Sequence, residues 1–212
     1  MIKKIIPQQT LAKPVNLQGV GLHSGKQIEL ILNPAPENSG IKFIRTDLDP
    51  VVEIPALANF VSKTDRSTLL LKENVEIQTT EHLLAALSGS SIHNCTIEIN
   101  GAELPILDGS SKPYCDAIQK AGVVSQNELQ EVFVFQEIME FKDPETGSEI
   151  LILPAEQTSF SVMIDFETTV LGTQNATLEN IEDFADQIAP ARTFSFLHEL
   201  EQLLDHGLIK GG

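Results

Sequence analysis

The stretch TTEHLLAAL, residues 79–87, has the pattern of a helix start. Threonine is a favourable residue at this point, because its hydroxyl can accept a hydrogen bond from a free backbone N–H of the first turn. Leu83, Ala86 and Leu87 recur at helical spacing, so we expect them to form one apolar face. This helix would pack against a sheet and carry polar residues at its beginning.

Glu81 and His82 fall in the first turn of this helix. The positive end of the helix dipole favours an ionised glutamate and a neutral histidine. A neutral imidazole can bind a metal ion, and a neighbouring carboxylate can take a proton from metal-bound water. Alternatively, Glu81 only complements the dipole and His82 is a half-buried helix residue. The pair lacks the second histidine of the more specific His-Glu-x-x-His pattern, so both interpretations stay open here.

The composition is that of an acidic globular protein. The 212 residues include 30 acidic and 14 basic side chains, which gives a formal net charge of −16. Binding to nucleic acid depends mainly on Lys and Arg, so this balance argues against a nucleic-acid partner. An anionic small molecule would need a local cluster of donors.

The sequence predicts a cytoplasmic protein. It has no apolar run of membrane-spanning length, so we expect no integral membrane segment. The apolar part of the N-terminus is too short for the core of a signal peptide. Cys95 and Cys115 are not in a Cys-x-x-Cys pair, and they are expected to be buried thiols in a reducing compartment.

The first half of the chain predicts an α+β fold. Ile28, Leu30 and Leu32 alternate with polar residues, which is typical of a half-buried strand. Two helices on one face of a mainly antiparallel sheet would form a two-layer sandwich. The expected strands are 27–33, 41–45, 51–54, 67–72, 75–78 and 94–100, and the expected helices are 81–89 and 112–121. Residues 41–54 are predicted to form a small insert outside the main sheet.

A polar stretch at 125–128 predicts a domain boundary, with a first domain over 1–126 and a partial second domain over 127–212. The second part again begins with strands. We expect strands at 132–135, 138–141, 149–153 and 159–166, and helices at 180–188 and 197–206. This part lacks a closing strand, so the second domain looks incomplete.

Six motifs together carry a family resemblance, through their order and spacing. They are GVGLHSG (19–25), NPAP (33–36), RTD (45–47), TEHLLAAL (80–87), ELPILDGS (103–110) and ARTFSF (191–196). The sequence from about residue 9 to residue 212 closely resembles the UDP-3-O-acyl-N-acetylglucosamine deacetylases, zinc amidases of lipid A biosynthesis. The resemblance implies two similar α+β sandwich domains whose helices pack between the two sheets.

The resemblance also implies roles for individual residues. His82 matches the first of three zinc (Zn²⁺) ligands, Glu81 matches the general base, and Thr193 matches a hydroxyl that stabilises the oxyanion. The expected substrate is a UDP-linked acylated amino sugar that loses its acetyl group. Substrate contacts are implied for Leu22, His23, Phe194, Phe196, Leu200 and Ile209. The competing interpretations are a loop histidine at His23, core phenylalanines, and ordinary helix packing at Leu200 and Ile209.

The match to the family pattern is partial, because the family's other two zinc ligands have no counterpart in this sequence. We therefore expect an N-terminal portion of a longer deacetylase, and the resemblance includes relatives in which a dehydratase domain follows the deacetylase. Such a portion should be inactive alone and should not hold zinc with normal affinity, since catalytic zinc sites need three protein ligands. Two alternatives are a non-catalytic binding or structural protein that keeps the fold, and a different metallohydrolase that uses His23 and a carboxylate.

Overall fold

A five-stranded sheet is the base of the fold. The computed structural model describes residues 2–166, 168–197 and 210–211. Neighbouring strands of the sheet are antiparallel except β9 and β4, which are parallel. In spatial order the strands are β2 (Val15–Val20), β3 (Gln27–Pro34), β9 (Cys95–Ile99), β4 (Ile41–Arg45) and β5 (Val52–Pro55).

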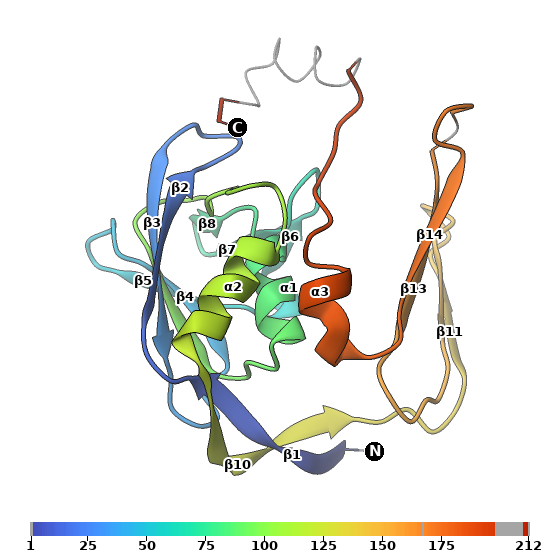
Figure 1. Ribbon diagram of the computed structural model, residues 1–212, viewed down its shortest axis with the longest axis horizontal. Coiled ribbons are helices and arrows are strands. Elements are labelled where there is room, and N and C mark those ends of the chain that lie inside the picture. The colour runs from blue at the N-terminus through green and yellow to red at the C-terminus, as the bar shows by residue number, and fades with distance from the viewer. Residues whose placement is uncertain (1, 167, 198–209, 212) are drawn as a thin grey trace.

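Helices α1 (Glu81–Gly89) and α2 (Lys112–Ala121) cover one face of this sheet (Figure 1). The alternation predicted for β3 is confirmed, because Ile28, Leu30 and Leu32 are buried and the residues between them are more exposed. The apolar face predicted for α1 is also confirmed. The core between the helices and the sheet includes Leu83, Ala86, Leu87, Tyr114, Ile118, Phe43, Ile54, Ile97 and Ile99.

Residues 41–54 do not form the predicted excursion from the main sheet. They form β4 and β5, and β4 lies between β9 and β5. Phe43 and Ile54 are fully buried, which explains why these strands belong to the core layer. A separate small sheet follows instead, made of β6 (Val61–Lys63), β7 (Leu69–Lys72) and β8 (Val75–Ile77), after the short helix η1 (Ala58–Phe60).

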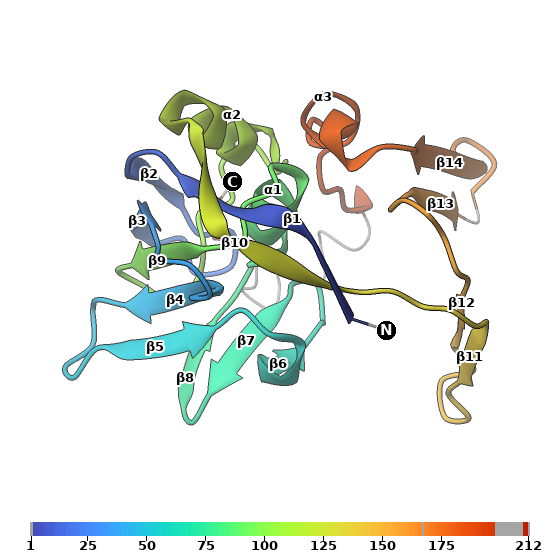
Figure 2. The same cartoon turned by 90° about the horizontal axis from the view of Figure 1, so that it is seen from below.

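A long two-stranded ribbon runs below the sandwich. It pairs β1 (Ile2–Leu11) with β10 (Val123–Phe133) in antiparallel register (Figure 2). The predicted domain boundary after residue 126 falls inside β10, so the polar stretch there is a strand. The division into two domains stays a prediction.

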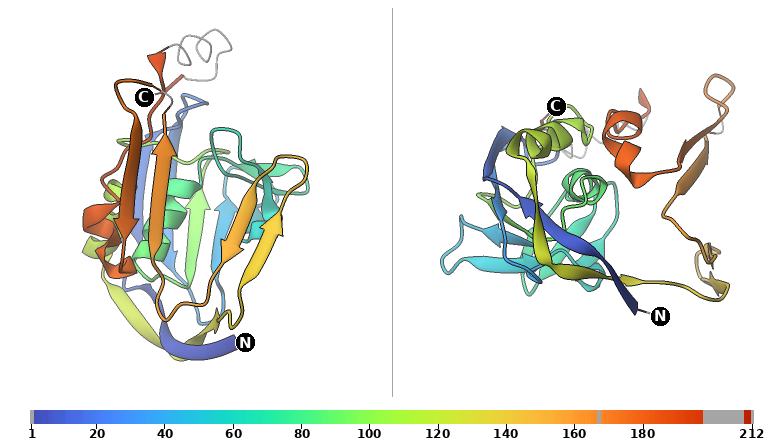
Figure 3. Two further views of the ribbon diagram at one scale, coloured as in Figure 1. Left: turned by 90° about the vertical axis from the view of Figure 1, so that its right-hand side faces the viewer. Right: turned by 60° about the horizontal axis from the view of Figure 1, so that its bottom comes forward.

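The second half consists of two hairpins and a short helical segment. The hairpins pair β11 (Met139–Lys142) with β12 (Glu149–Ile152) and β13 (Phe160–Asp165) with β14 (Thr173–Leu178). Helix η2 (Ile181–Asp183) leads into α3 (Phe184–Gln187), which is shorter than the predicted helix. The three α-helices lie between the five-stranded sheet and the second hairpin (Figure 3), and the α+β class is confirmed. The predicted helix at 197–206 lies almost wholly outside the described residues.

Helix α3 packs against the end of α1. Phe184 is buried, and a Cβ added at Gly89 would lie 2.2 Å from its Cδ1 atom. The glycine therefore allows the close approach of the two helices. None of the helices in the part of the chain that the structure describes is both long enough and apolar enough to cross a membrane.

His93 connects β1 to the rest of the fold through two hydrogen bonds to Gln9. The backbone N–H of Gln9 donates to His93 Nδ1 at 3.0 Å, and the backbone N–H of His93 donates to Gln9 O at 2.9 Å. Burial lowers the pKa of His93 below its ordinary value. The neutral imidazole is needed here, since a protonated Nδ1 is a donor and could not accept the Gln9 N–H.

We therefore expect His93 to make stability depend on pH. Below its ordinary pKa of about 6.5 the unfolded chain takes up a proton at His93, whereas the folded protein resists it. The free energy of unfolding should fall as the pH is lowered from 7.5 to 5.5. In His93→Asn, the amide oxygen can accept the Gln9 N–H without titrating, so the fall should be smaller. Urea denaturation across this pH range would test it, and equal slopes for the two proteins would contradict it.

Candidate functional site

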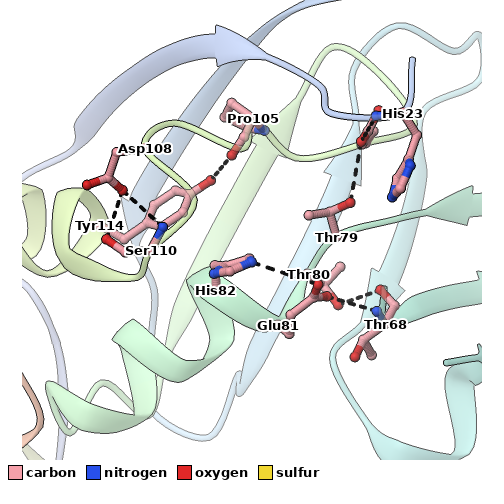
Figure 4. Close-up of polar contacts among 11 residues, drawn as sticks. His23, Thr68, Thr79, Thr80, Glu81, His82, Pro105, Asp108, Ser110 and Tyr114 are labelled. Carbon is pink, nitrogen blue, oxygen red and sulfur yellow. Dashed lines mark hydrogen bonds and ion pairs between the residues drawn. The ribbon is translucent and has the colours of Figure 1, made fainter. Parts of the chain in front are cut away.

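The start of α1 is tied to the strand that begins at Leu69. The hydroxyl of Thr80 donates to Thr68 O at 3.0 Å, and the backbone N–H of Thr68 donates to Glu81 Oε2 at 2.8 Å (Figure 4). The predicted capping role of the threonine is wrong, because Thr80 makes no side-chain cap to the first turn. Its hydroxyl instead helps to fix where the helix begins.

The side chains of Glu81 and His82 approach each other at the start of α1. His82 Nε2 is 4.0 Å from Glu81 Oε1, and their side chains are 16% and 37% exposed. Since Thr68 occupies the other carboxylate oxygen, Oε1 is the atom of Glu81 that faces the imidazole (Figure 4). The imidazole and the carboxylate are therefore close enough to contact the same bound group.

A cavity of about 700 Å³ lies at the segment that binds Glu81, although neither Glu81 nor His82 lines it. Its lining includes His23 from the glycine-rich loop and the segment Lys63–Ser67, together with Leu69. Thr68, which binds Glu81, stands between two of these lining residues. A second cavity of about 330 Å³ also has His23 in its wall. His23 thus lines both cavities, and its contact with a substrate stays a prediction.

The glycine-rich loop also contains Leu22, another predicted substrate residue. Its side chain is half-buried, and its carbonyl accepts the N–H groups of Lys210 at 3.0 Å and Gly211 at 3.1 Å. A Cβ at Gly211 would lie 2.4 Å from Gly21 O, so this contact needs glycine. The contact shows the backbone of Leu22 in a structural role, and a role for its side chain stays a prediction.

Thr193 lies next to the turn that introduces α2. Its backbone N–H donates to Gly109 O at 2.8 Å. In the same turn Asp108 Oδ1 accepts hydrogen bonds from the N–H and hydroxyl of Ser110. Burial opposes the charge on Asp108, but these bonds and nearby Arg192 lower its pKa overall. Asp108 is thus a turn residue, and the oxyanion role of Thr193 stays a prediction.

Phe194 and Phe196 form an aromatic cluster with Phe166. The three ring centroids are 5.2, 5.8 and 6.3 Å apart in edge-to-face arrangements. Phe194 is nevertheless 59% exposed, so a face of the cluster is open to a ligand. Leu200 and Ile209, the other predicted substrate residues, lie outside the described residues.

The described residues do not complete a zinc site. A catalytic zinc usually takes three protein ligands. Among residues 2–166, 168–197 and 210–211, no group of three His, Cys, Asp or Glu side chains could hold a metal ion. Burial raises the pKa of Cys115 to about 11 and that of Cys95 to about 12, so neither is a thiolate at neutral pH. His82 can supply one ligand, and the predicted completion of a site by His23 finds no support in these residues.

Two residues for which we expected no role stabilise the surroundings of the site. They are Glu103 of the 103–110 motif and Tyr114 of α2. Glu103 accepts the backbone N–H groups of His23 and Ser24, each at 2.8 Å. Tyr114 is fully buried in α2, and its hydroxyl donates to Pro105 O at 2.6 Å. Burial and the nearby charge of Glu81 raise the pKa of Tyr114. Long-range contacts of this kind leave no periodic signal in a sequence.

Tyr114→Phe should therefore destabilise the fold without creating a cavity. The buried carbonyl of Pro105 would lose its donor, which costs about 1–3 kcal/mol. Ser161→Ala, which removes an exposed hydroxyl bond to Thr177 Oγ1, is a control expected to change stability by less than about 0.5 kcal/mol. Urea denaturation measures both, and equal effects would show that the Tyr114 bond has no special weight.

Comparison with known proteins identifies the family. The profile described as LpxC, UDP-3-O-acyl N-acetylglycosamine deacetylase, matches residues 8–212. The chain is 42% identical over 208 residues to a bifunctional enzyme LpxC/FabZ of Bacteroides thetaiotaomicron, covering 98% of the chain and 45% of that relative. It is 44% identical over 206 residues to a UDP-3-O-acyl-N-acetylglucosamine deacetylase of Myxococcus xanthus, covering 97% of the chain and 65% of the relative.

A third relative gives the same result. The chain is 41% identical over 211 residues to a UDP-3-O-acyl-N-acetylglucosamine deacetylase of Saccharophagus degradans, covering 98% of the chain and 69% of the relative. The chain thus spans less than half of the first of these curated relatives and about two thirds of the other two. The match extends over all the motifs that frame Glu81 and His82, and the chain belongs to the UDP-3-O-acyl-N-acetylglucosamine deacetylase family.

Proposed function

We propose that the protein containing these residues hydrolyses the acetamide of a UDP-3-O-acyl-N-acetylglucosamine in lipid A biosynthesis. The observation that carries the proposal is family membership over residues 8–212, in a chain that retains the Glu81-His82 pair. Its relatives from Myxococcus and Saccharophagus are named for this deacetylation. The buried thiols Cys95 and Cys115 are compatible with a cytoplasmic location, which is part of the proposal.

Zinc is the proposed cofactor, with His82 as one ligand and the other ligands outside the described residues. When bound, zinc would polarise the acetamide carbonyl and favour ionisation of water. Glu81 would accept the proton of the attacking water at Oε1, because Oε2 is held by the Thr68 N–H. On this proposal residues 1–212 alone would bind zinc weakly and would be inactive.

The substrate would lie in the cavity lined by His23 and the 63–67 segment. His23 would contact its polar part, and the exposed ring of Phe194 would pack on an apolar or planar group. Thr193 would stabilise the oxyanion. Leu22, Phe196, Leu200 and Ile209 complete the proposed contacts.

A non-catalytic protein that keeps the fold and binds a nucleotide sugar is the second candidate. The observation that favours it is the lack of a three-donor group among the described residues. Its discriminating property would be substrate binding without zinc-dependent release of acetate.

Glu81→Gln should lower kcat by about 10²- to 10⁴-fold, the usual contribution of a general base. The amide oxygen can still accept the Thr68 N–H, so the fold should be retained. Acetate release from the UDP-sugar would be measured. Glu53→Gln removes an equally charged but exposed carboxylate, paired with Lys42, and should leave kcat unchanged. A Glu81→Gln protein with activity within threefold of wild type would rule out the general-base role.

Metal content separates the roles of the two residues. In the full-length protein Glu81→Gln should keep zinc after dialysis, whereas His82→Ala should lose it, because a ligand is removed. His23→Ala should keep zinc. Elemental analysis of the purified proteins gives the zinc stoichiometry. Full occupancy in His82→Ala would refute the ligand assignment, and loss in His23→Ala would revive the alternative metal site.

A further inference from the structure

Glu103 is a buried carboxylate with both oxygens directed at backbone. It is 3% exposed and lies in the connection between β9 and α2. Oε1 accepts the His23 N–H and Oε2 accepts the Ser24 N–H, each at 2.8 Å. Two successive amides of the glycine-rich loop are thus held by one side chain from about 80 residues away.

The same carboxylate reaches Thr79, which lies two residues before α1 begins. The hydroxyl of Thr79 donates to Glu103 Oε1 at 3.4 Å. Thr79 has a φ of 58°, a left-handed conformation that a β-branched residue rarely adopts. Such a conformation persists only where its surroundings hold it, and the contact with Glu103 is part of those surroundings.

The backbone around Glu103 is itself hydrogen-bonded to Gln78, the residue that follows β8. The N–H of Gln78 donates to Ala102 O at 2.8 Å, and the N–H of Leu104 donates to Gln78 O at 3.0 Å. These two bonds hold the segment on either side of Glu103 beside Gln78. Because its backbone is held in this way, the side chain of Glu103 can position both the glycine-rich loop and Thr79.

Gly21 makes the fit between Glu103 and the loop possible. A Cβ at this position would lie 2.4 Å from Glu103 Oε2 and 2.4 Å from Ser24 Oγ. Any other residue would push the carboxylate or the loop away. The glycine of the loop and the glutamate that binds it thus form one unit.

From these contacts we propose that Glu103 is a positioning residue of the site. It sets the spacing between the loop that carries His23 and the first turn of α1, which carries Glu81 and His82. It borders the cavity of about 330 Å³, but it is only 3% exposed and both oxygens accept backbone N–H groups, so its proposed role is to hold the loop and not to bind substrate. The inference rests on the proposed function, since it assigns His23 and the Glu81-His82 pair to one reaction. A displacement of about 1 Å at such a site can cost about 10²-fold in rate.

Glu103→Gln is the first test, in the full-length zinc-loaded protein. The amide has one oxygen for two N–H donors, so one loop bond is lost. We expect kcat to fall about 10- to 100-fold with zinc content unchanged. Amide hydrogen exchange at His23 and Ser24 should accelerate at least about tenfold. The backbone NMR signals of Glu81 and His82 should shift.

Glu98→Gln is the matched control. Glu98 is half-buried and accepts a side-chain bond from Asn33 on the sheet, so the change removes a hydrogen-bonded carboxylate away from the loop. It should leave kcat, exchange at His23 and the NMR signals of the site unchanged. Gly21→Ala is a second variant, which displaces the loop while keeping the carboxylate. It should reproduce the local exchange and the shifted signals even if Glu103→Gln folds poorly.

Two results would overturn the positioning role. One is unchanged exchange at His23 and Ser24 in both variants. The other is faster exchange with kcat within twofold of wild type and unmoved signals at Glu81 and His82, which would reduce Glu103 to a loop anchor. A wild-type protein without deacetylase activity would contradict the proposed function instead. The positioning role would then be decided by the site signals, with shifted signals supporting it and unmoved signals overturning it.

Discussion

Burial of the apolar face of α1 against the five-stranded sheet is the interaction on which the rest of the site depends. A nine-residue helix is not stable alone in water, so its position comes from packing. Leu83 and Leu87 are fully buried, and each such side chain contributes about 1.5–3 kcal/mol. Because this face packs on the sheet, the orientation of the first turn of α1 is fixed. Glu81 and His82 are therefore placed by leucines that take no part in chemistry.

The second constraint is the segment 104–106, which forms backbone hydrogen bonds to two different parts of the chain. Leu104 N–H donates to Gln78 O, and Ile106 N–H donates to Val20 O, each at 3.0 Å. The segment thereby joins the end of β2 to the residues just before α1. Backbone bonds at fixed length hold these parts together more rigidly than long side chains would. This arrangement explains why motifs that are far apart in sequence meet around one cavity.

Sequence patterns predicted the parts of the fold that have local periodicity. The boundaries of α2 agree with the prediction, and the alternation in β3 gave its buried face correctly. Strands β1 and β14 were missed, because β1 pairs with residues over 110 positions away and β14 is mostly polar. The adjacency of Glu81 and His82 follows from their positions, but their roles came from family resemblance. Thr68 and Glu103 could not be predicted, since their contacts involve backbone N–H groups of distant segments.

The second half of the structure is less well packed than the first, and this affects what fixes the position of Thr193. Side chains on the hairpins are largely exposed, for example Phe141 at 61% and Leu151 at 62%, and isolated hairpins are only marginally stable. The second half contributes Leu178, Phe184 and Ala189 to the hydrophobic core, and Phe184 packs on α1. Beyond α3, two backbone bonds hold the chain to the start of α2, from Ser111 N–H to Ala189 O and from Thr193 N–H to Gly109 O. The position of Thr193 thus follows from the packing of α3 and from these two bonds.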